Sequence, residues 1–182
     1  MKYEIGVPKF KDEEKKNVLI VGDSHGRDTF FALKLNENLF DNYEFSIIHT
    51  EIKCLNTIKN NFKICDRYMT NLQKNIFLEA DIIILSSSYS DEDLSKIDTT
   101  INNLISFNKI IIIFSNKPGF YFENYQTYVD QFFIKEKKLP EGSDLIDMKK
   151  KYFNSIDDKS KRSNIILKKI SKKYDLKFFE TS

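Results

Sequence analysis

Residues 17–29 read Asn-Val-Leu-Ile-Val-Gly-Asp-Ser-His-Gly-Arg-Asp-Thr, and this stretch decides the fold class. The unbroken apolar run Val18–Val21 is typical of a strand that is covered on both faces of a parallel sheet. Gly22 ends the run, small and polar side chains follow, and an apolar pattern at helical spacing begins at Thr29. Ser24 is therefore predicted to lie between the first strand and the first helix, where open α/β sheets bind their ligands.

The same alternation of apolar runs and helical patterns continues along the chain, which predicts βαβ units. Strands are predicted at Val18–Val21, Glu44–His49, Asp81–Leu85, Ile110–Phe114 and Leu176–Phe179. Helices are predicted at Asp28–Leu39, Asp66–Glu79 and Asp91–Phe107, and in two or three pieces between Tyr121 and Tyr174 that are broken around Pro140. We therefore expect an α/β fold with three layers, α/β/α, around a central parallel sheet.

Two further predictions concern single positions in these helices. In the first helix, Phe31, Leu35 and Leu39 share one face, which predicts that this face is buried. In the third helix, Asp91 stands at the start of the pattern and is predicted to cap it.

The bulk composition limits the class of protein. The 182 residues are enough for one domain with a sizeable core, and we expect residues 1–16 to be an extension or linker and residues 17–182 to form that domain. With 41% hydrophobic residues, the chain is too apolar to be disordered. Its 29 basic and 27 acidic side chains leave a net charge of +2, which argues against a dedicated nucleic-acid binder.

The chain has no segment that resembles a membrane span or a signal peptide. No run approaches the roughly 20 apolar residues that a spanning helix needs. Residues 1–16 also lack the apolar core of a signal peptide. We therefore expect this chain, taken alone, neither to span a membrane nor to be exported.

The two cysteines, Cys54 and Cys65, lie in a polar stretch after the second predicted strand. They do not make a zinc site, because such a site needs four ligands. Two free thiols and a short-loop disulfide both remain open. A disulfide would imply an oxidising compartment.

The tetrapeptide Gly22-Asp23-Ser24-His25, directly after a buried strand, resembles the first sequence block of the SGNH (GDSL-like) hydrolases. These are esterases and acyltransferases with a flavodoxin-like three-layer fold. More narrowly, the chain resembles the SGNH domain attached to membrane acyltransferases that O-acetylate bacterial surface polysaccharides. The cysteine pair, the block Ile82–Ser90 and the strand and loop Ile110–Phe120 carry this narrower resemblance.

The resemblance implies that Ser24 attacks an ester carbonyl and forms an acyl-enzyme. Serine needs a base, and the family draws a histidine and its carboxylate from an Asp-x-x-His block near the C-terminus. This sequence has no such block, so we expect a truncated stretch of a longer enzyme or a pseudoenzyme, with little activity of its own. Its two histidines are His25, which is awkwardly placed beside Ser24, and His49, which either acts as base or is a polar residue at a strand end.

An oxyanion hole needs hydrogen-bond donors aimed at the developing negative charge, and the backbone N–H of Ser24 is one candidate. Further residues near the ends of the first and third predicted strands are candidates for the oxyanion hole or for substrate contact: Asp23, His25, Ser87, Ser88 and Tyr89. Of these, Asp23 is expected to help hold the turn rather than to act as the acid of a triad.

Three functions follow from these patterns. The first is a serine esterase or O-acyltransferase that acts on acetyl or other acyl esters of cell-surface polysaccharide, with an acylated glycan or another small ester as substrate. The second is a catalytically inactive module that binds carbohydrate or ester on the same fold. The third is a nucleotide-binding or flavin-binding domain, but the chain has neither a Gly-x-Gly-x-x-Gly nor a Walker motif.

The resemblance also implies a partner and a compartment. A covalently linked membrane acyltransferase would place this domain in the periplasm, and without it the domain would be cytoplasmic. We expect no cofactor, no metal ion and no nucleic-acid partner.

Overall fold

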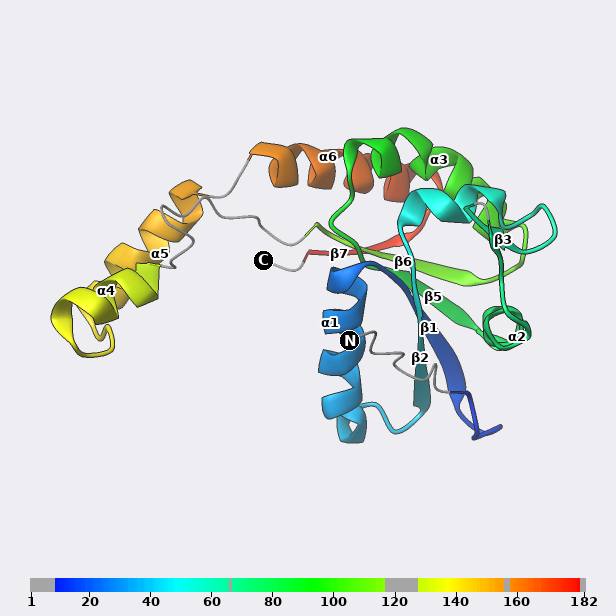
Figure 1. The fold of residues 1–182 in the computed structure, drawn as a ribbon, viewed down its shortest axis with the longest axis horizontal. Helices are drawn as coiled ribbons and strands as arrows, with labels where there is room; N and C mark the ends of the chain where they lie inside the picture. The colour runs from blue at the N-terminus through cyan, green and yellow to red at the C-terminus, as the bar shows by residue number, and fades with distance from the viewer. Residues whose placement is uncertain (1–8, 66, 117–127, 156–157, 181–182) are drawn as a thin grey trace. The chain divides into compact units, whose positions relative to one another are not determined.

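Figure 1 shows the computed structural model of the chain, which describes residues 9–65, 67–116, 128–155 and 158–180. The chain divides into two compact units. The first combines the chain up to residue 116 with residues 163–181, and it contains the parallel sheet. The second, residues 117–162, contains the helices α4 (Tyr128–Glu136) and α5 (Ser143–Ser155). The break between these helices falls around Pro140, as predicted.

A five-stranded parallel sheet forms the centre of the first unit. Its strands in chain order are β1 (Lys16–Gly22), β2 (Tyr43–His49), β5 (Ile82–Leu85), β6 (Ile110–Phe114) and β7 (Lys177–Phe179). They lie in the order β2-β1-β5-β6-β7, and each neighbouring pair is parallel. The predicted strands are confirmed, including the short one near the C-terminus.

Helices cover both faces of this sheet (Figure 1). The helices of the first unit are α1 (Ser24–Leu35), α2 (Asn71–Glu79), α3 (Asp91–Ile105) and residues 163–173 of α6 (Asp158–Lys173). Successive side chains of a strand point to opposite faces, so Leu19 joins the core under α2, α3 and α6 whereas Val18 joins the core under α1. This mixed α/β arrangement is compatible with the three-layer fold expected from the sequence. No described helix is long and apolar enough to cross a membrane.

Shorter elements complete the first unit. They are the 3-10 helices η1 (Glu37–Leu39) and η2 (Ile52–Thr57) and the antiparallel hairpin of β3 (Lys63–Ile64) and β4 (Arg67–Tyr68). Before β1, the backbone N–H groups of Lys11 and Asp12 donate to the carboxylate of Glu44, at 2.6 and 3.1 Å. This part of the expected extension is therefore tied to the start of β2.

The first helix begins one turn earlier than predicted. It starts at Ser24 rather than Asp28 because Asp23 caps it, accepting a hydrogen bond from the backbone N–H of His25 at 2.9 Å. The polar residues that the sequence pattern placed in a loop therefore form the first turn of α1.

The buried face of α1 also differs from the prediction. Phe31, Leu35 and Leu39 are 43%, 83% and 72% exposed, so the predicted buried face was wrong. Phe30 is buried against the sheet instead, and Leu33 packs beside it. The contact of the first turn with the end of β5, described below, fixes which side of the helix meets the sheet.

Ser90 rather than Asp91 caps α3. The Ser90 hydroxyl accepts from the backbone N–H of Asp93 at 3.1 Å, and the Asp93 carboxylate accepts from the backbone N–H of Ser90 at 2.8 Å. This reciprocal pair satisfies two backbone donors at once, whereas a cap at Asp91 would satisfy one.

Candidate active site at the carboxyl edge of the sheet

The carboxyl ends of β1, β5 and β6 bring polar residues to one edge of the sheet. Ser24 follows β1, the segment 86–88 follows β5, and Ser115 and Asn116 follow β6. The chain passes from β1 outward to β2 and then returns across β1 to β5. Such a reversal leaves a crevice beyond the carboxyl ends of the two inner strands, where doubly wound sheets bind ligands.

The turn after β1 is packed tightly against the end of β5. A Cβ on Gly22 would overlap the carbonyl oxygen of Ser86, and one on Gly26 would lie 2.9 Å from the same oxygen. The buried hydroxyls of Thr29 and Ser86 are hydrogen-bonded at 2.8 Å. Only glycine fits at position 22, and this close approach fixes where the first turn of α1 lies.

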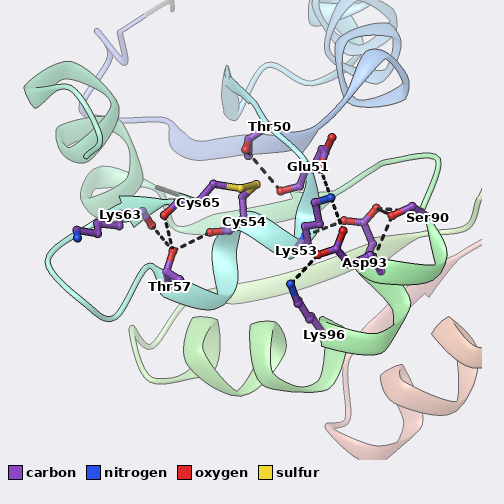
Figure 2. The surroundings of a disulfide bond; sticks show 11 residues. Thr50, Glu51, Lys53, Cys54, Thr57, Lys63, Cys65, Ser90, Asp93 and Lys96 are labelled. Carbon is purple, nitrogen blue, oxygen red and sulfur yellow. Dashed lines mark hydrogen bonds and ion pairs between the residues drawn. A yellow bond between two sulfur atoms is a disulfide. The ribbon is translucent and has the colours of Figure 1, made fainter. Parts of the chain in front are cut away.

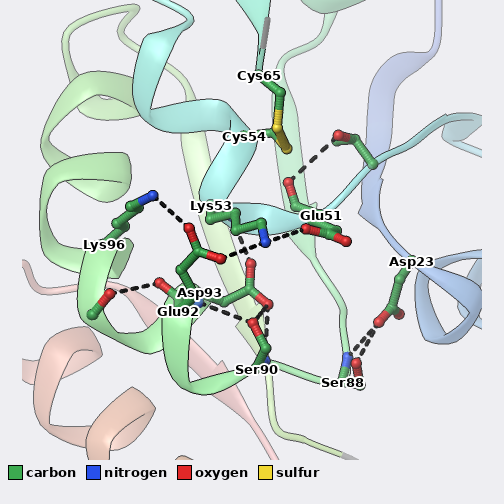
Figure 3. A network of polar contacts seen from close by, with 12 residues as sticks. Asp23, Glu51, Lys53, Cys54, Cys65, Ser88, Ser90, Glu92, Asp93 and Lys96 are labelled. Atoms are coloured by element: carbon green, nitrogen blue, oxygen red, sulfur yellow. Dashed lines mark hydrogen bonds and ion pairs between the residues drawn. A yellow bond between two sulfur atoms is a disulfide. The ribbon is translucent and has the colours of Figure 1, made fainter.

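Asp23 joins this turn to the loop after β5 (Figure 3). Besides capping α1, its carboxylate accepts from the backbone N–H of Ser88 at 3.1 Å and from the Ser88 hydroxyl at 2.5 Å. Partial burial raises the pKa of the Asp23 carboxyl, but the hydrogen bonds from Ser88 and His25 outweigh it and bring the pKa below its usual value. Asp23 is therefore ionised at neutral pH and holds the turn.

Ser24 and His25 differ in their exposure to solvent. Ser24 is exposed at the first position of α1, where the backbone N–H groups have no partner within the helix and the helix dipole favours negative charge. His25 is half-buried, and its backbone serves the turn: the N–H donates to Asp23 and the carbonyl accepts from the Thr29 hydroxyl at 2.9 Å.

The structure separates the three candidates that follow β5. Ser88 is exposed and its hydroxyl donates to Asp23. Ser87 is 2% exposed, and its hydroxyl has no hydrogen-bond partner in the part of the chain that the structure describes. The Ser87 hydroxyl therefore has no partner among the described residues, but it is buried and does not line the cavity described below.

Tyr89 lies in the core rather than on the surface of the site. Its side chain is fully buried, and its hydroxyl donates to the backbone carbonyl of Leu85 at 2.9 Å. Burial, together with the nearby charges of Asp93 and Asp23, raises the pKa of the Tyr89 phenol well above its usual value. Tyr89 therefore stays neutral and supports the loop from below, out of reach of a substrate.

A cavity of about 690 Å³ opens beside Asp23. Polar and aromatic side chains from the turn after β1, from β2 and the residues that follow it, from the hairpin and from α2 line it, including Asp23, His49, Glu51, Arg67, Tyr68 and Gln73. His49 is exposed and stands opposite Gly22 in the β1–β2 register, and the next residue, Thr50, donates its N–H to the Gly22 carbonyl at 2.9 Å. Since neighbouring strands lie about 4.8 Å apart, His49 is at the same edge as Ser24, one strand away.

Cys54 and Cys65 form a disulfide that belongs to the cavity wall (Figure 2). The structure thus decides between the two alternatives that the sequence left open. The backbone N–H of Cys65 donates to the Cys54 carbonyl at 3.2 Å, and the Thr57 hydroxyl is 3.1 Å from the carbonyls of both Cys54 and Lys63. These contacts hold the short hairpin to η2.

A polar network anchors η2 to the start of α3 (Figure 3). The Lys53 ammonium is 2.8 Å from Glu51 and 2.6 Å from Glu92, and the backbone N–H of Lys53 donates to the buried Asp93 at 2.7 Å. Hydrogen bonds from Lys53 and Lys96 lower the pKa of the exposed Glu92 carboxyl to about 2. The 3-10 helix η2, which carries Cys54, is therefore held both by the disulfide to the hairpin and by the Lys53 contacts to α3.

The predicted start of the second helix was wrong, and residues that line this cavity were therefore missed as candidates. The prediction placed Arg67 and Tyr68 inside a helix from Asp66 to Glu79, whereas the helix begins at Asn71. A capping box begins α2: the Thr70 hydroxyl accepts from the N–H of Gln73, and the Gln73 side chain accepts from the N–H of Thr70. The spacing Thr-x-x-Gln is a sequence signal for this start and would have left Arg67 and Tyr68 outside the helix.

The end of β6 is held by the neighbouring elements. The Ser115 N–H donates to the Phe179 carbonyl at 2.8 Å, and the Asn164 side chain pairs with the N–H and the carbonyl of Asn116 at 2.6 and 3.1 Å. Residues 117–120 of the proline-containing loop, which contributes to the resemblance, lie outside the described residues.

No protein-family model matches this chain, and no curated protein matches it. Among the residues whose structure is described, no group of three or more histidine, cysteine, aspartate or glutamate side chains could hold a metal ion. The polar side chains at this edge carry hydroxyl, imidazole, carboxylate and guanidinium groups.

Proposed function

We propose that the chain is an SGNH-like serine esterase or O-acyltransferase domain that acts on acetyl or other acyl esters of cell-surface polysaccharide, with Ser24 as nucleophile. One observation carries the proposal: Ser24 is exposed at the start of α1, at the crevice between β1 and β5 and next to the Asp23 that borders the cavity. The strand order, counted within the main sheet as 2-1-3-4-5, is that of flavodoxin-like folds and supports the same assignment.

In the proposed reaction, the Ser24 hydroxyl oxygen attacks the ester carbonyl while a base takes its proton. The C–O bond of the ester then breaks, the departing alcohol receives that proton, and the acyl group remains on Ser24. Water or a glycan hydroxyl next attacks the acyl-serine and restores the Ser24 hydroxyl. The Ser24 N–H is the donor proposed to stabilise the oxyanion, and one such donor contributes roughly 100-fold to 1,000-fold in kcat.

The base must be a histidine that reaches Ser24. The Asp-x-x-His block that the resemblance implies is not in this chain. Of the two histidines present, His49 has the better position, because it is exposed, opposes Gly22 and borders the cavity with Asp23. We therefore propose His49 as the base available within these residues, and a histidine from outside them as the alternative source.

The disulfide is the basis for the proposed compartment, the periplasm. Disulfides persist in oxidising environments, so the Cys54–Cys65 bond supports a periplasmic location. A covalently linked membrane acyltransferase would then be the partner that supplies the acyl group.

A covalent trap tests Ser24 directly, even where turnover is slow. A fluorophosphonate probe bonds its phosphorus to an activated serine and loses fluoride, and mass spectrometry locates the label. We expect a label on Ser24, loss of labelling and of acetate release from p-nitrophenyl acetate in Ser24→Ala, and at least a tenfold loss in His49→Ala. The matched control is Ser95→Ala, an exposed serine on α3 whose hydroxyl donates to the Glu92 carbonyl.

A catalytically inactive binding module is the second candidate. It is favoured by the absence, within the described residues, of a carboxylate hydrogen-bonded to His49, since a catalytic histidine is normally oriented by such a group. Equal labelling and equal acetate release in the unsubstituted chain, Ser24→Ala and Ser95→Ala would contradict the esterase and leave the binding module.

A further inference from the structure

Arg67 is a cation on the cavity wall. It is exposed on β4, borders the cavity and has neither an ion pair nor a hydrogen bond with any residue that the structure describes. A guanidinium group presents its donors in a planar fork that matches a carboxylate, and such charge-assisted pairs are the strong ones. Arg67 is therefore free to meet an anionic group on a ligand.

The acidic side chains of the same cavity are already occupied. Asp23 accepts hydrogen bonds from Ser88 and His25, and Glu51 is paired with the Lys53 ammonium at 2.8 Å. The Lys53 ammonium offsets the charge of Glu51, whereas Asp23 accepts from neutral donors and keeps its negative charge. Among the charged side chains on this wall, Asp23 and Glu51 are hydrogen-bonded or paired with other described residues, and Arg67 is not.

Tyr68 places an aromatic ring beside this cation. Its side chain is 66% exposed and also borders the cavity. The Lys63 ammonium lies 4.8 Å from the centre of the ring. An exposed ring offers an apolar face to the C–H side of a sugar, and Gln73 and Thr70 add polar groups to the same wall.

The disulfide fixes these two residues in place. The hairpin that carries them has strands of two residues each, too short to be stable alone. The link from Cys65 to Cys54, with the Thr57 contacts, holds the hairpin to η2, which the Lys53 network anchors in turn. The backbone of Arg67 and Tyr68 is therefore held in place, so less conformational entropy is lost when a ligand binds.

We propose that this cavity binds an acidic sugar, with the sugar carboxylate on the Arg67 guanidinium and the sugar ring against Tyr68. This inference rests on the proposed function, which supplies the polysaccharide substrate. It specifies the class of that polysaccharide: one that contains uronic acid or a similar carboxylated sugar. The cavity of about 690 Å³ is within the usual size range of small-ligand sites.

Binding to the Ser24→Ala chain tests this inference apart from catalysis. The probes are tetragalacturonate and its carboxyl-reduced, uncharged counterpart, compared by titration calorimetry. We expect tetragalacturonate to bind about tenfold more tightly, and Arg67→Ala to remove that difference while leaving the affinity for the uncharged probe unchanged. Tyr68→Ala should weaken both probes about threefold to tenfold, because both carry the ring that it contacts.

The control variant is Arg162→Ala, which removes an exposed arginine that does not border the cavity and should change neither affinity. Equal affinity for the two probes, or a preference for tetragalacturonate that survives Arg67→Ala, would overturn the acidic-sugar site whatever the outcome of the labelling of Ser24. Conversely, a preference that depends on Arg67 in a chain whose Ser24 does not label would keep the sugar site and remove the esterase.

Discussion

The two sides of the cavity are built in different ways. On the side of β1, Asp23 stands on a turn that is packed backbone against backbone onto β5, with no room for a Cβ at Gly22, and Ser24 is the next residue of the same turn. On the opposite side, Arg67 and Tyr68 stand on a two-stranded hairpin that one disulfide and a few hydrogen bonds hold to η2. The first side is continuous with the core, whereas the second depends on a local link.

The way in which each side is held matches the role proposed for it. A nucleophile needs a position fixed to within a fraction of an ångström, and close packing against a buried sheet fixes that position without a covalent cross-link. A recognition surface tolerates variation, and a short loop that is closed by a disulfide presents exposed side chains without a core beneath them. The sheet side is therefore expected to be indispensable for folding and the hairpin side to be separable from it.

The largest effect should follow from Gly22→Ala. The added methyl group meets the backbone carbonyl of Ser86, which cannot move without shifting β5, so we expect a loss of roughly 4 kcal/mol or more in the free energy of unfolding. Urea unfolding followed by circular dichroism measures it. Gly142→Ala is the control: its Cβ meets nothing within 4 Å and its φ of +53° should cost only about 1 kcal/mol. Equal losses in the two variants would show that the packed turn is not special.

An intermediate effect should follow from removal of the disulfide. We expect the double variant Cys54→Ala with Cys65→Ala to lose about 2–3 kcal/mol, because the unfolded chain regains the freedom of the closed loop. Amide hydrogen exchange should become faster at Ile64, Arg67 and Tyr68 while 26–30 stays protected, which separates the hairpin from the sheet side. Two free thiols in the freshly isolated, denatured and non-reduced chain would contradict the bond itself.

The smallest effect should come from Asp23, which reaches the cavity from the sheet side. Asp23→Ala removes a helix cap and the acceptor for Ser88, for an expected loss of about 1 kcal/mol at neutral pH. Folding lowers the pKa of this carboxyl from its usual 3.8, so its contribution to stability is complete above that value and is lost as the pH falls through the folded-state pKa.

Asp23→Asn separates the cap from the charge. The amide oxygen of this variant can still cap α1 by accepting from the His25 N–H, whereas the amide nitrogen takes the place of the oxygen that accepts from Ser88. The amide does not titrate, so the stability of this variant should fall less steeply in acid than that of the unsubstituted chain. Stability profiles measured between about pH 6 and pH 2 compare the two. Parallel profiles would mean that the ionisation of Asp23 contributes nothing to stability.

Much of the fold could be predicted because it depends on local patterns. The apolar runs in β1, β5 and β6 are unbroken, and β2 has a buried apolar pair before its last residue, which is typical of strands in a parallel sheet that is covered on both faces. The position of Ser24 at a strand-to-helix turn followed from the same pattern. The side of α1 that meets the sheet did not, because Phe30 and Phe31 are adjacent and equally apolar.

The sequence by itself determined the strands, the sites of the two cysteines and the polar residues at the sheet edge, because periodicity and residue type act within a few positions. Only the tertiary structure decided that Tyr89 is buried, that Ser88 is bound to Asp23, and that Arg67 shares a cavity with Asp23. These relations join segments that are far apart in the chain. They are set by strand order and by the contact at Gly22, which no local pattern contains.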